Sequence, residues 1–218
     1  MRKIILVLLA VLLLTGCSRT VKKLPTEAVT EQPTKINESS VPVSIPTELK
    51  DTAESVTVSF DYSRASTHAS NQIAIWVEDE NGRLIKTLFV TDFTAARRGY
   101  LDREDALSRW VSIANPDGMS DSELDAVSSA TPAEGSLNYI WNMTNDVGER
   151  VQDGRYTICL EITLYWTSNV LYTAQINTAD PISGDLEFTE TRSEPDNTQN
   201  AEMIQNVKFT VATSSVGK

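Results

Sequence analysis

Apolar side chains recur at every second position over most of the chain beyond residue 54, and this pattern restricts the fold more than any other feature. In the first such run Val56, Val58 and Phe60 alternate with polar neighbours. Successive side chains of a strand point to opposite faces, so a period of two predicts strands with one buried face. Comparable runs lie within residues 73–77, 83–91, 137–141, 156–164, 170–176, 186–191 and 207–211.

Turn residues separate these runs at short intervals. Asn81-Gly82 is the strongest hairpin signal, because both residues tolerate the positive φ of a tight turn. About eight short strands joined by turns are typical of an antiparallel sandwich or barrel. We expect an all-β fold over residues 54–218, an immunoglobulin-like antiparallel β-sandwich with a short helical insertion.

The N-terminal segment predicts export and a lipid anchor. Two basic residues precede an apolar run at residues 4–14. At about 1.5 Å per residue this run is too short for a hydrocarbon core of about 30 Å, so it is typical of a secretory signal. The Leu-Thr-Gly-Cys sequence that ends at Cys17 resembles a bacterial lipobox. The resemblance implies lipidation of Cys17 and removal of residues 1–16 as a signal peptide.

A stalk is expected between the lipidated cysteine and the sandwich. Residues 17–53 show no apolar periodicity. They contain four prolines, which exclude a continuous helix or a central strand: Pro25, Pro33, Pro42 and Pro46. The protein is therefore expected in the cell envelope, lipid-anchored on the outer side of the cytoplasmic membrane or in the periplasm at the outer membrane.

Acidic side chains clearly outnumber basic ones. The chain has 30 Asp and Glu against 19 Lys and Arg, a formal net charge of -11. A nucleic-acid partner would require surplus basic side chains to neutralise phosphates, so none is expected. The expected partners are the membrane, through the lipid anchor, and either an envelope protein or a small ligand that the insertion contacts. No cofactor is expected.

The region from residue 101 to 131 departs from the period of two. Leu107, Trp110 and Val111 have the spacing of one helical turn, for which Asp102 or Asp105 could supply the N-cap.

A second helical turn is expected to begin at Asp121 or Ser122 and to bury Leu124 and Val127. An insertion of this length is a common place for function, so we predict a binding site there. The candidate residues are Asp102, Glu104, Asp105, Trp110, Asp117, Asp121 and Asp125.

The acidic side chains of the insertion leave a calcium-dependent role open, because hard cations take oxygen ligands. The EF-hand pattern is not met, since Met119 and Ser120 stand where it needs an acidic residue and a glycine. Carboxylates also favour helix N-termini without any metal. The sequence therefore assigns no metal ligands.

Nucleophilic catalysis is not expected. His68 is the single histidine, and no carboxylate lies near enough in sequence to orient it. Cys159 would need cationic neighbours to form a thiolate, and Glu161 on the same strand face opposes this. We predict that the thiol is an inert, packed group and that the protein is not an enzyme.

Several large side chains fall on the strand face opposite the main apolar series. Trp76 alternates with Ile75 and Val77, and Cys159 and Tyr165 are placed similarly on their strand. Two interpretations are open, since this face is either covered by the insertion or is an exposed aromatic patch that could include Trp166, and covering is favoured.

One motif carries a resemblance to known proteins. Its structural signature is Trp141, Asp146, Gly148, Gly154 and Tyr156, with Trp76 upstream. The spacing resembles the immunoglobulin-like domain of flagellar hook-capping proteins. There a strand ends at tryptophan, an acidic turn reverses the chain, and Gly-x-Tyr begins the next strand. Related modules carry further aspartates where Asn142 and Asn145 stand here.

The longer order of motifs, from residue 71 to the signature, resembles a family of predicted periplasmic, secreted bacterial proteins without an assigned function. Both resemblances imply a fold and a compartment but no catalytic residues. The expected function is a non-catalytic binding or accessory module on an envelope lipoprotein. The alternatives are a calcium-dependent enzyme accessory and a structural spacer in a surface assembly.

Overall fold

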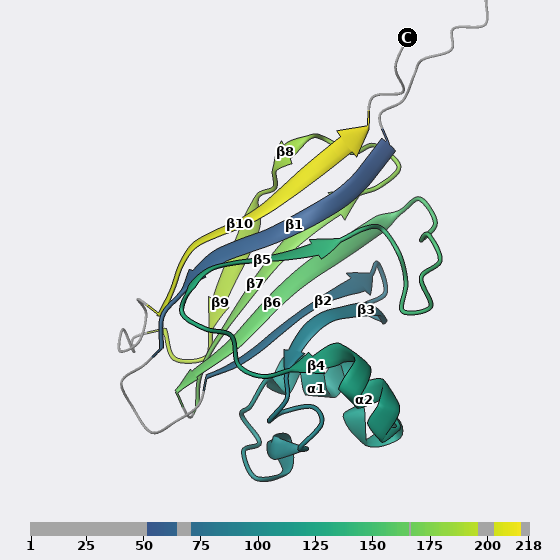
Figure 1. Cartoon of the computed structure of the whole chain (residues 1–218). Coiled ribbons are helices and arrows are strands. Elements are labelled where there is room, and N and C mark those ends of the chain that lie inside the picture. Colours follow the sequence, from purple (N-terminus) through teal and green to yellow (C-terminus); the bar gives the residue numbers. More distant parts are fainter. Residues whose placement is uncertain (1–51, 65–70, 166, 196–202, 215–218) are drawn as a thin grey trace, which may run out of the picture. The chain divides into compact units, whose positions relative to one another are not determined.

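The period-two runs form strands, and the strands assemble into two sheets that face each other (Figure 1). The computed structural model describes residues 52–64, 71–165, 167–195 and 203–214, all of which lie in one compact unit, Pro46–Lys218. The first sheet has the strand order β5 (Gly135–Trp141), β1 (Thr52–Tyr62), β10 (Ile204–Ser214) and β8 (Gly184–Asp185). The second has the order β4 (Ser128–Ser129), β3 (Leu84–Thr91), β2 (Gln72–Asp79), β6 (Arg155–Tyr165), β7 (Ser168–Asn177) and β9 (Phe188–Arg192).

The expected β-sandwich with a helical insertion is confirmed, with two differences in detail. The described residues form ten strands rather than about eight, because two of them are only two residues long. The sheets are not wholly antiparallel, since β4 pairs with Val90 and Thr91 of β3 in the parallel direction. β4 directly follows the insertion. It runs beside the last two residues of β3 and in the same direction.

The main core lies between the two sheets. Val56, Val58 and Phe60 of β1 project inward and are buried against the inner face of β2 and β6. Aromatic rings add directional contacts, because the ring of Trp141 at the end of β5 lies 5.3 Å from that of Tyr156 on β6. The alternation of the sequence therefore positions the inner side chains as expected.

The insertion packs on the outer face of the second sheet (Figure 1). It consists of η1 (Gly99–Leu101), α1 (Ser108–Ala114), η2 (Pro116–Gly118) and α2 (Asp121–Val127). A second apolar cluster fills the space beneath it, formed by Ala74, Trp76, Val90, Ala95, Leu107, Trp110, Leu124 and Cys159. The interpretation that the insertion covers Trp76 is thus confirmed. In the described part of the chain no helix has the length and hydropathy of a membrane span.

The two glycines of the signature have different roles. Gly148, in the turn between β5 and β6, has a φ of 83°, a conformation that residues with a Cβ rarely adopt. Gly154, by contrast, is not among the glycines with a positive φ. In the β2–β3 hairpin, likewise, Gly82 has a φ of 73° while Asn81 has no positive φ.

Replacing Gly148 with alanine is expected to lower the free energy of unfolding by about 1 kcal/mol, because only the backbone conformation opposes a Cβ there. No heavy atom lies within 4 Å of an ideal Cβ at Gly148. Gly154→Ala is the matched control, since its Cβ would meet Tyr156 at an ordinary 3.9 Å. Urea unfolding of both variants checks this, and an equal loss in the two would contradict it.

Candidate functional site

A buried carboxylate on the sheet fixes where the insertion's first helix begins. Glu161 of β6 is buried, and its two carboxylate oxygens accept the backbone N–H groups of Arg109 and Trp110 at 3.0 and 2.8 Å. These are N–H groups of the first turn of α1, which have no partner within the helix. The N-cap residue itself, Leu107, provides no side-chain hydrogen bond. Glu161 of β6 therefore caps the N-terminus of α1, although it lies on a different element.

The prediction that Asp102 or Asp105 caps α1 is consequently wrong. Leu107 occupies the N-cap position with a φ of 53°, and both aspartates lie earlier in the chain with exposed side chains. Asp105 contributes through its backbone carbonyl, which accepts a hydrogen bond from the Asn169 side chain at 3.0 Å. The second expected helix is confirmed, with Ser120 and Glu123 forming a capping box at its start.

A second buried carboxylate joins the sheet to the insertion. Glu78 of β2 accepts hydrogen bonds from the indole N–H of Trp76 at 2.8 Å and from the Arg109 guanidinium at 3.0 Å. The thiol of Cys159 lies 3.7 Å from the same carboxylate. Burial, reinforced by Glu78, raises the pKa of this thiol well above its ordinary value, which agrees with the inert group expected from the sequence.

The carboxylates predicted to form the binding site do not gather at one point. Asp117 accepts hydrogen bonds from Tyr100 at 2.5 Å and Arg98 at 3.1 Å, and Asp121 lies 3.8 Å from the same arginine. The other acidic candidates are exposed: Asp102, Glu104, Asp105 and Asp125. In the residues that the structure describes, no group of three His, Cys, Asp or Glu side chains is arranged to hold a metal ion.

Trp110 acts from inside the insertion rather than on its surface. Its side chain is fully buried in the second cluster, and its indole N–H donates to Thr87 of β3 at 3.2 Å. Trp110 therefore anchors α1 to the sheet. Although it was among the predicted binding residues, its side chain is not accessible to a ligand in this structure. Cys17, His68 and Trp166 lie outside the described residues.

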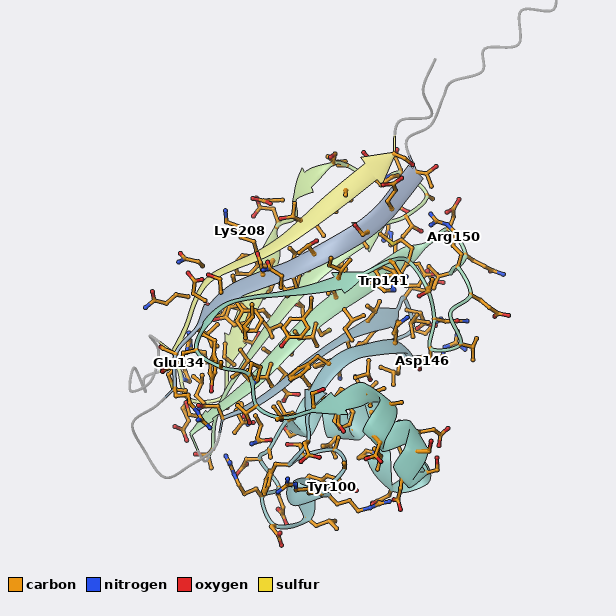
Figure 2. All side chains as sticks on the ribbon, in the orientation of Figure 1. Tyr100, Glu134, Trp141, Asp146, Arg150 and Lys208 are labelled. Carbon is orange, nitrogen blue, oxygen red and sulfur yellow. The ribbon has the colours of Figure 1, made fainter. Side chains whose placement is uncertain are left out.

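The signature turn between β5 and β6, residues 142–154, is fastened to both sheets. The Trp141 indole N–H donates to the carbonyl of Thr144 at 2.9 Å. From the second sheet, the Lys86 ammonium donates to the Thr144 hydroxyl at 2.8 Å and to the carbonyl of Asn145 at 3.3 Å. The turn, labelled at Trp141, Asp146 and Arg150 in Figure 2, therefore has a fixed position beside β3.

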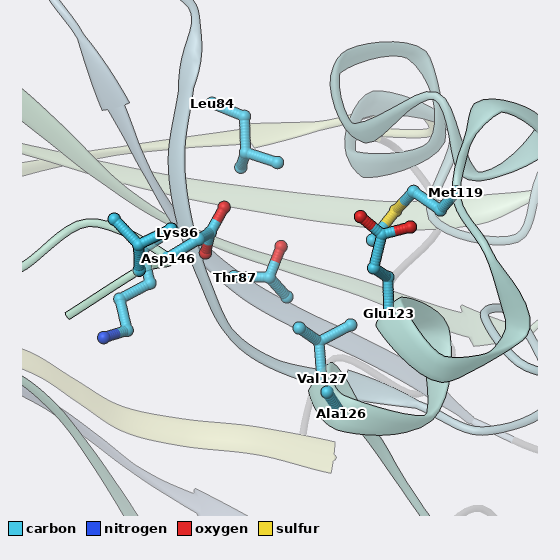
Figure 3. A pocket seen from close by; sticks show the side chains of 9 residues that line it. Leu84, Lys86, Thr87, Met119, Glu123, Ala126, Val127 and Asp146 are labelled. Atoms are coloured by element: carbon cyan, nitrogen blue, oxygen red, sulfur yellow. The ribbon is translucent and has the colours of Figure 1, made fainter.

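A groove of about 410 Å³ lies between this turn, β3 and α2 (Figure 3). Its apolar lining consists of Leu84, Met119, Ala126, Val127 and Val147. Its polar lining consists of Lys86, Thr87, Glu123 and Asp146. The volume is within the usual range for a small-molecule or side-chain site. Among the signature residues, Asp146 is the one that lines the groove.

Asp146 is held against the edge of the sheet. Its carboxylate faces the backbone N–H of Thr87, which favours the charged form of the carboxyl. Partial burial raises the pKa of Asp146, and the Thr87 N–H and the charge of Lys86 offset part of this rise. Glu123, on the opposite wall, accepts hydrogen bonds from the N–H and hydroxyl of Ser120, both at 2.7 Å, which hold its pKa below the ordinary value.

The groove is lined by segments that are far apart in the sequence, between residues 84 and 147. A local sequence pattern therefore does not predict it. Several lining residues, among them Lys86, Val127 and Asp146, lie within the motifs described above, but no motif brings them together.

In the sequence, Glu161 stands out only as a neighbour of Cys159. The available sequence signal is a glutamate within each of two apolar strands, Glu78 and Glu161. A charged side chain in a buried strand needs a polar partner, so these residues indicate that polar groups pack on the outer face of the sheet.

Comparison with known families agrees with this architecture. Residues 53–190 match the model of a family described as predicted periplasmic protein (DUF2271). The chain belongs to this family. Residues 1–18 match a prokaryotic membrane lipoprotein lipid attachment site. No curated protein and no solved structure matches the chain.

This DUF2271 protein is therefore a lipid-anchored protein of the cell envelope, as its N-terminal segment predicted. The resemblance to predicted periplasmic proteins is confirmed. The comparisons give no support to the relation with flagellar hook-capping proteins, which rests on the signature spacing alone.

Substituting Glu161 with alanine is expected to lower the free energy of unfolding by about 3 kcal/mol, because the backbone N–H groups of Arg109 and Trp110 lose a buried acceptor and the Arg109 guanidinium loses a nearby negative charge. Asp105→Ala, at the cap position expected from the sequence, should change it by no more than about 0.5 kcal/mol. Hydrogen exchange should speed up within residues 108–114 in the first variant only. Unchanged protection in Glu161→Ala would contradict the capping role.

The same carboxyl should give stability a distinctive pH dependence. Burial raises the pKa of Glu161 above its ordinary value, which it keeps in the unfolded chain. At a pH between the two values, the folded state therefore holds a proton that the unfolded state has lost. The free energy of unfolding should therefore fall as the pH rises through this window. Glu161→Gln should lack this component, which urea unfolding across the pH range checks. Parallel pH profiles in the two proteins would contradict it.

Proposed function

We propose that the domain is a non-catalytic binding module and that it binds its ligand in the groove between α2, β3 and the β5–β6 turn. The lipid attachment site and the periplasmic family support a location at the envelope surface, where such a module would meet its partners. The groove combines a concave shape, an apolar lining drawn from three segments and two carboxylates on opposite walls, a combination that the dispersed acidic loops of the insertion do not offer.

The observation that carries this proposal is that both walls of the groove are fastened by buried contacts. On one side, Glu161 and Trp110 fix the insertion that contains α2. On the other, Lys86 and Trp141 fix the turn. A preformed groove loses little conformational freedom when a ligand binds, which favours recognition.

The non-catalytic part of the proposal is supported by the chemistry of the buried thiol. Cys159 is covered by the insertion, and its raised pKa makes it a poor nucleophile. The calcium-dependent alternative has less support, since the acidic candidates of the insertion are dispersed over its surface. A spacer role in a surface assembly rests on the signature resemblance alone.

The proposal predicts that a partner contacts the groove in the intact envelope. A photo-crosslinking residue at Val147, which lines the groove and is 78% exposed, should give a specific adduct in cells that produce the full lipoprotein. Ile182 is the matched control, an 80% exposed apolar residue outside the groove.

Adducts should be resolved by mass after illumination and affinity isolation. An adduct from Val147 that is absent from Ile182 supports the groove as the site. The same adduct from both positions, or none from Val147, contradicts it.

A further inference from the structure

The charged groups that line the groove differ in the partners that they have within the fold. Lys86 donates to Thr144 and Asn145, and its ammonium lies on the side of β3 away from α2 (Figure 3). The two carboxylates, Asp146 and Glu123, stand on opposite walls. Neither has a salt bridge to Lys or Arg within 4 Å in the described part of the chain. Although the charge of Lys86 reaches Asp146, two carboxylates and one ammonium leave the lining with a net negative charge, which favours a cation.

The apolar lining suits the rest of a basic side chain. Leu84, Val127 and Val147 come from three different segments and line the groove together with the two carboxylates. Lysine and arginine have long aliphatic stems that pack on apolar surface while their charged ends reach polar groups.

Strand addition at the neighbouring edge of β3 is disfavoured. In the described residues, β4 pairs with Val90 and Thr91 only, which leaves the first part of this edge without a strand. However, the pairing of β3 with β2 has two register shifts, and bulges of this kind twist an edge away from a new strand. The backbone N–H of Thr87 already interacts with the carboxylate of Asp146. A partner would therefore be recognised by its side chains.

We infer, on the basis of the proposed function, that the groove binds a segment of a partner polypeptide in which a lysine or arginine is flanked by apolar residues. The basic side chain lies between Asp146 and Glu123, and an apolar neighbour packs on Val127 and Val147. A formal net charge of -11 on the whole chain favours the approach of such a basic segment.

Titration of the full-length lipoprotein in zwitterionic lipid nanodiscs tests the inference directly. The probe is an acetylated and amidated peptide, valine–lysine–leucine–lysine–valine, compared with the same peptide carrying glutamine for lysine. The lysine peptide should bind at least about fivefold more tightly, with an affinity that falls as salt is raised. N-methylation of the central peptide bond should leave its affinity unchanged.

Two variants remove charge while keeping the hydrogen bonds of the fold. Asp146→Asn retains an acceptor for Thr87, and Glu123→Gln retains the capping box. Each should weaken the lysine peptide about threefold to tenfold. Asp125→Asn, a charge loss on α2 outside the groove, is the matched control and should leave the affinity unchanged.

The outcomes separate this inference from the proposed function. Equal affinities for the two peptides, or an equal loss in all three variants, overturn the basic-segment assignment. If Val147 still crosslinks a partner in that case, the groove remains the binding site for another chemistry. Spermidine that binds as tightly as the lysine peptide and displaces it would also overturn the inference, in favour of a small polyamine.

Discussion

The fold depends on one constraint, that the second sheet has apolar side chains on both of its faces. A sandwich needs only the inner face to be buried, yet Trp76 and Cys159 project outward from β2 and β6. Covering one tryptophan removes about 150–250 Å² from water, which at about 25 cal/mol per Å² contributes about 4–6 kcal/mol. The insertion supplies this cover, and its helices are short because they need only span this patch of sheet.

Covering the sheet with helices creates a second requirement, because helix ends have polar groups that cannot be buried without partners. Glu161 meets it at the start of α1, and Glu78 holds Arg109 beside it. Both carboxylates are themselves buried, so they lose hydration that the helix N–H groups and the guanidinium only partly replace. Their contribution is to set one position for the insertion, and hence for the wall of the groove that α2 forms.

The sequence was informative where the cause of a structure is local. The alternation around Val58 predicts β1, and the Ser120–Glu123 capping box lies at the expected start of α2. It failed for α1 because the cap comes from a residue 51 positions further along, and no local pattern contains that pairing. The groove was missed for the same reason, since Leu84, Glu123 and Asp146 meet only after the sheets have formed.

The signature turn shows how the same residues can serve both the fold and the surface. The side-chain oxygens of Asn142 and Asn145 accept hydrogen bonds from the hydroxyl of Thr144 and the backbone N–H of Glu149 within the turn. Their side chains are thus used to shape the loop, whereas Asp146 reaches β3 and lines the groove. A rigid turn that places one carboxylate beside an apolar wall favours selective recognition of a cation with an aliphatic stem over binding of a bare metal ion, which would need several oxygen ligands at one point.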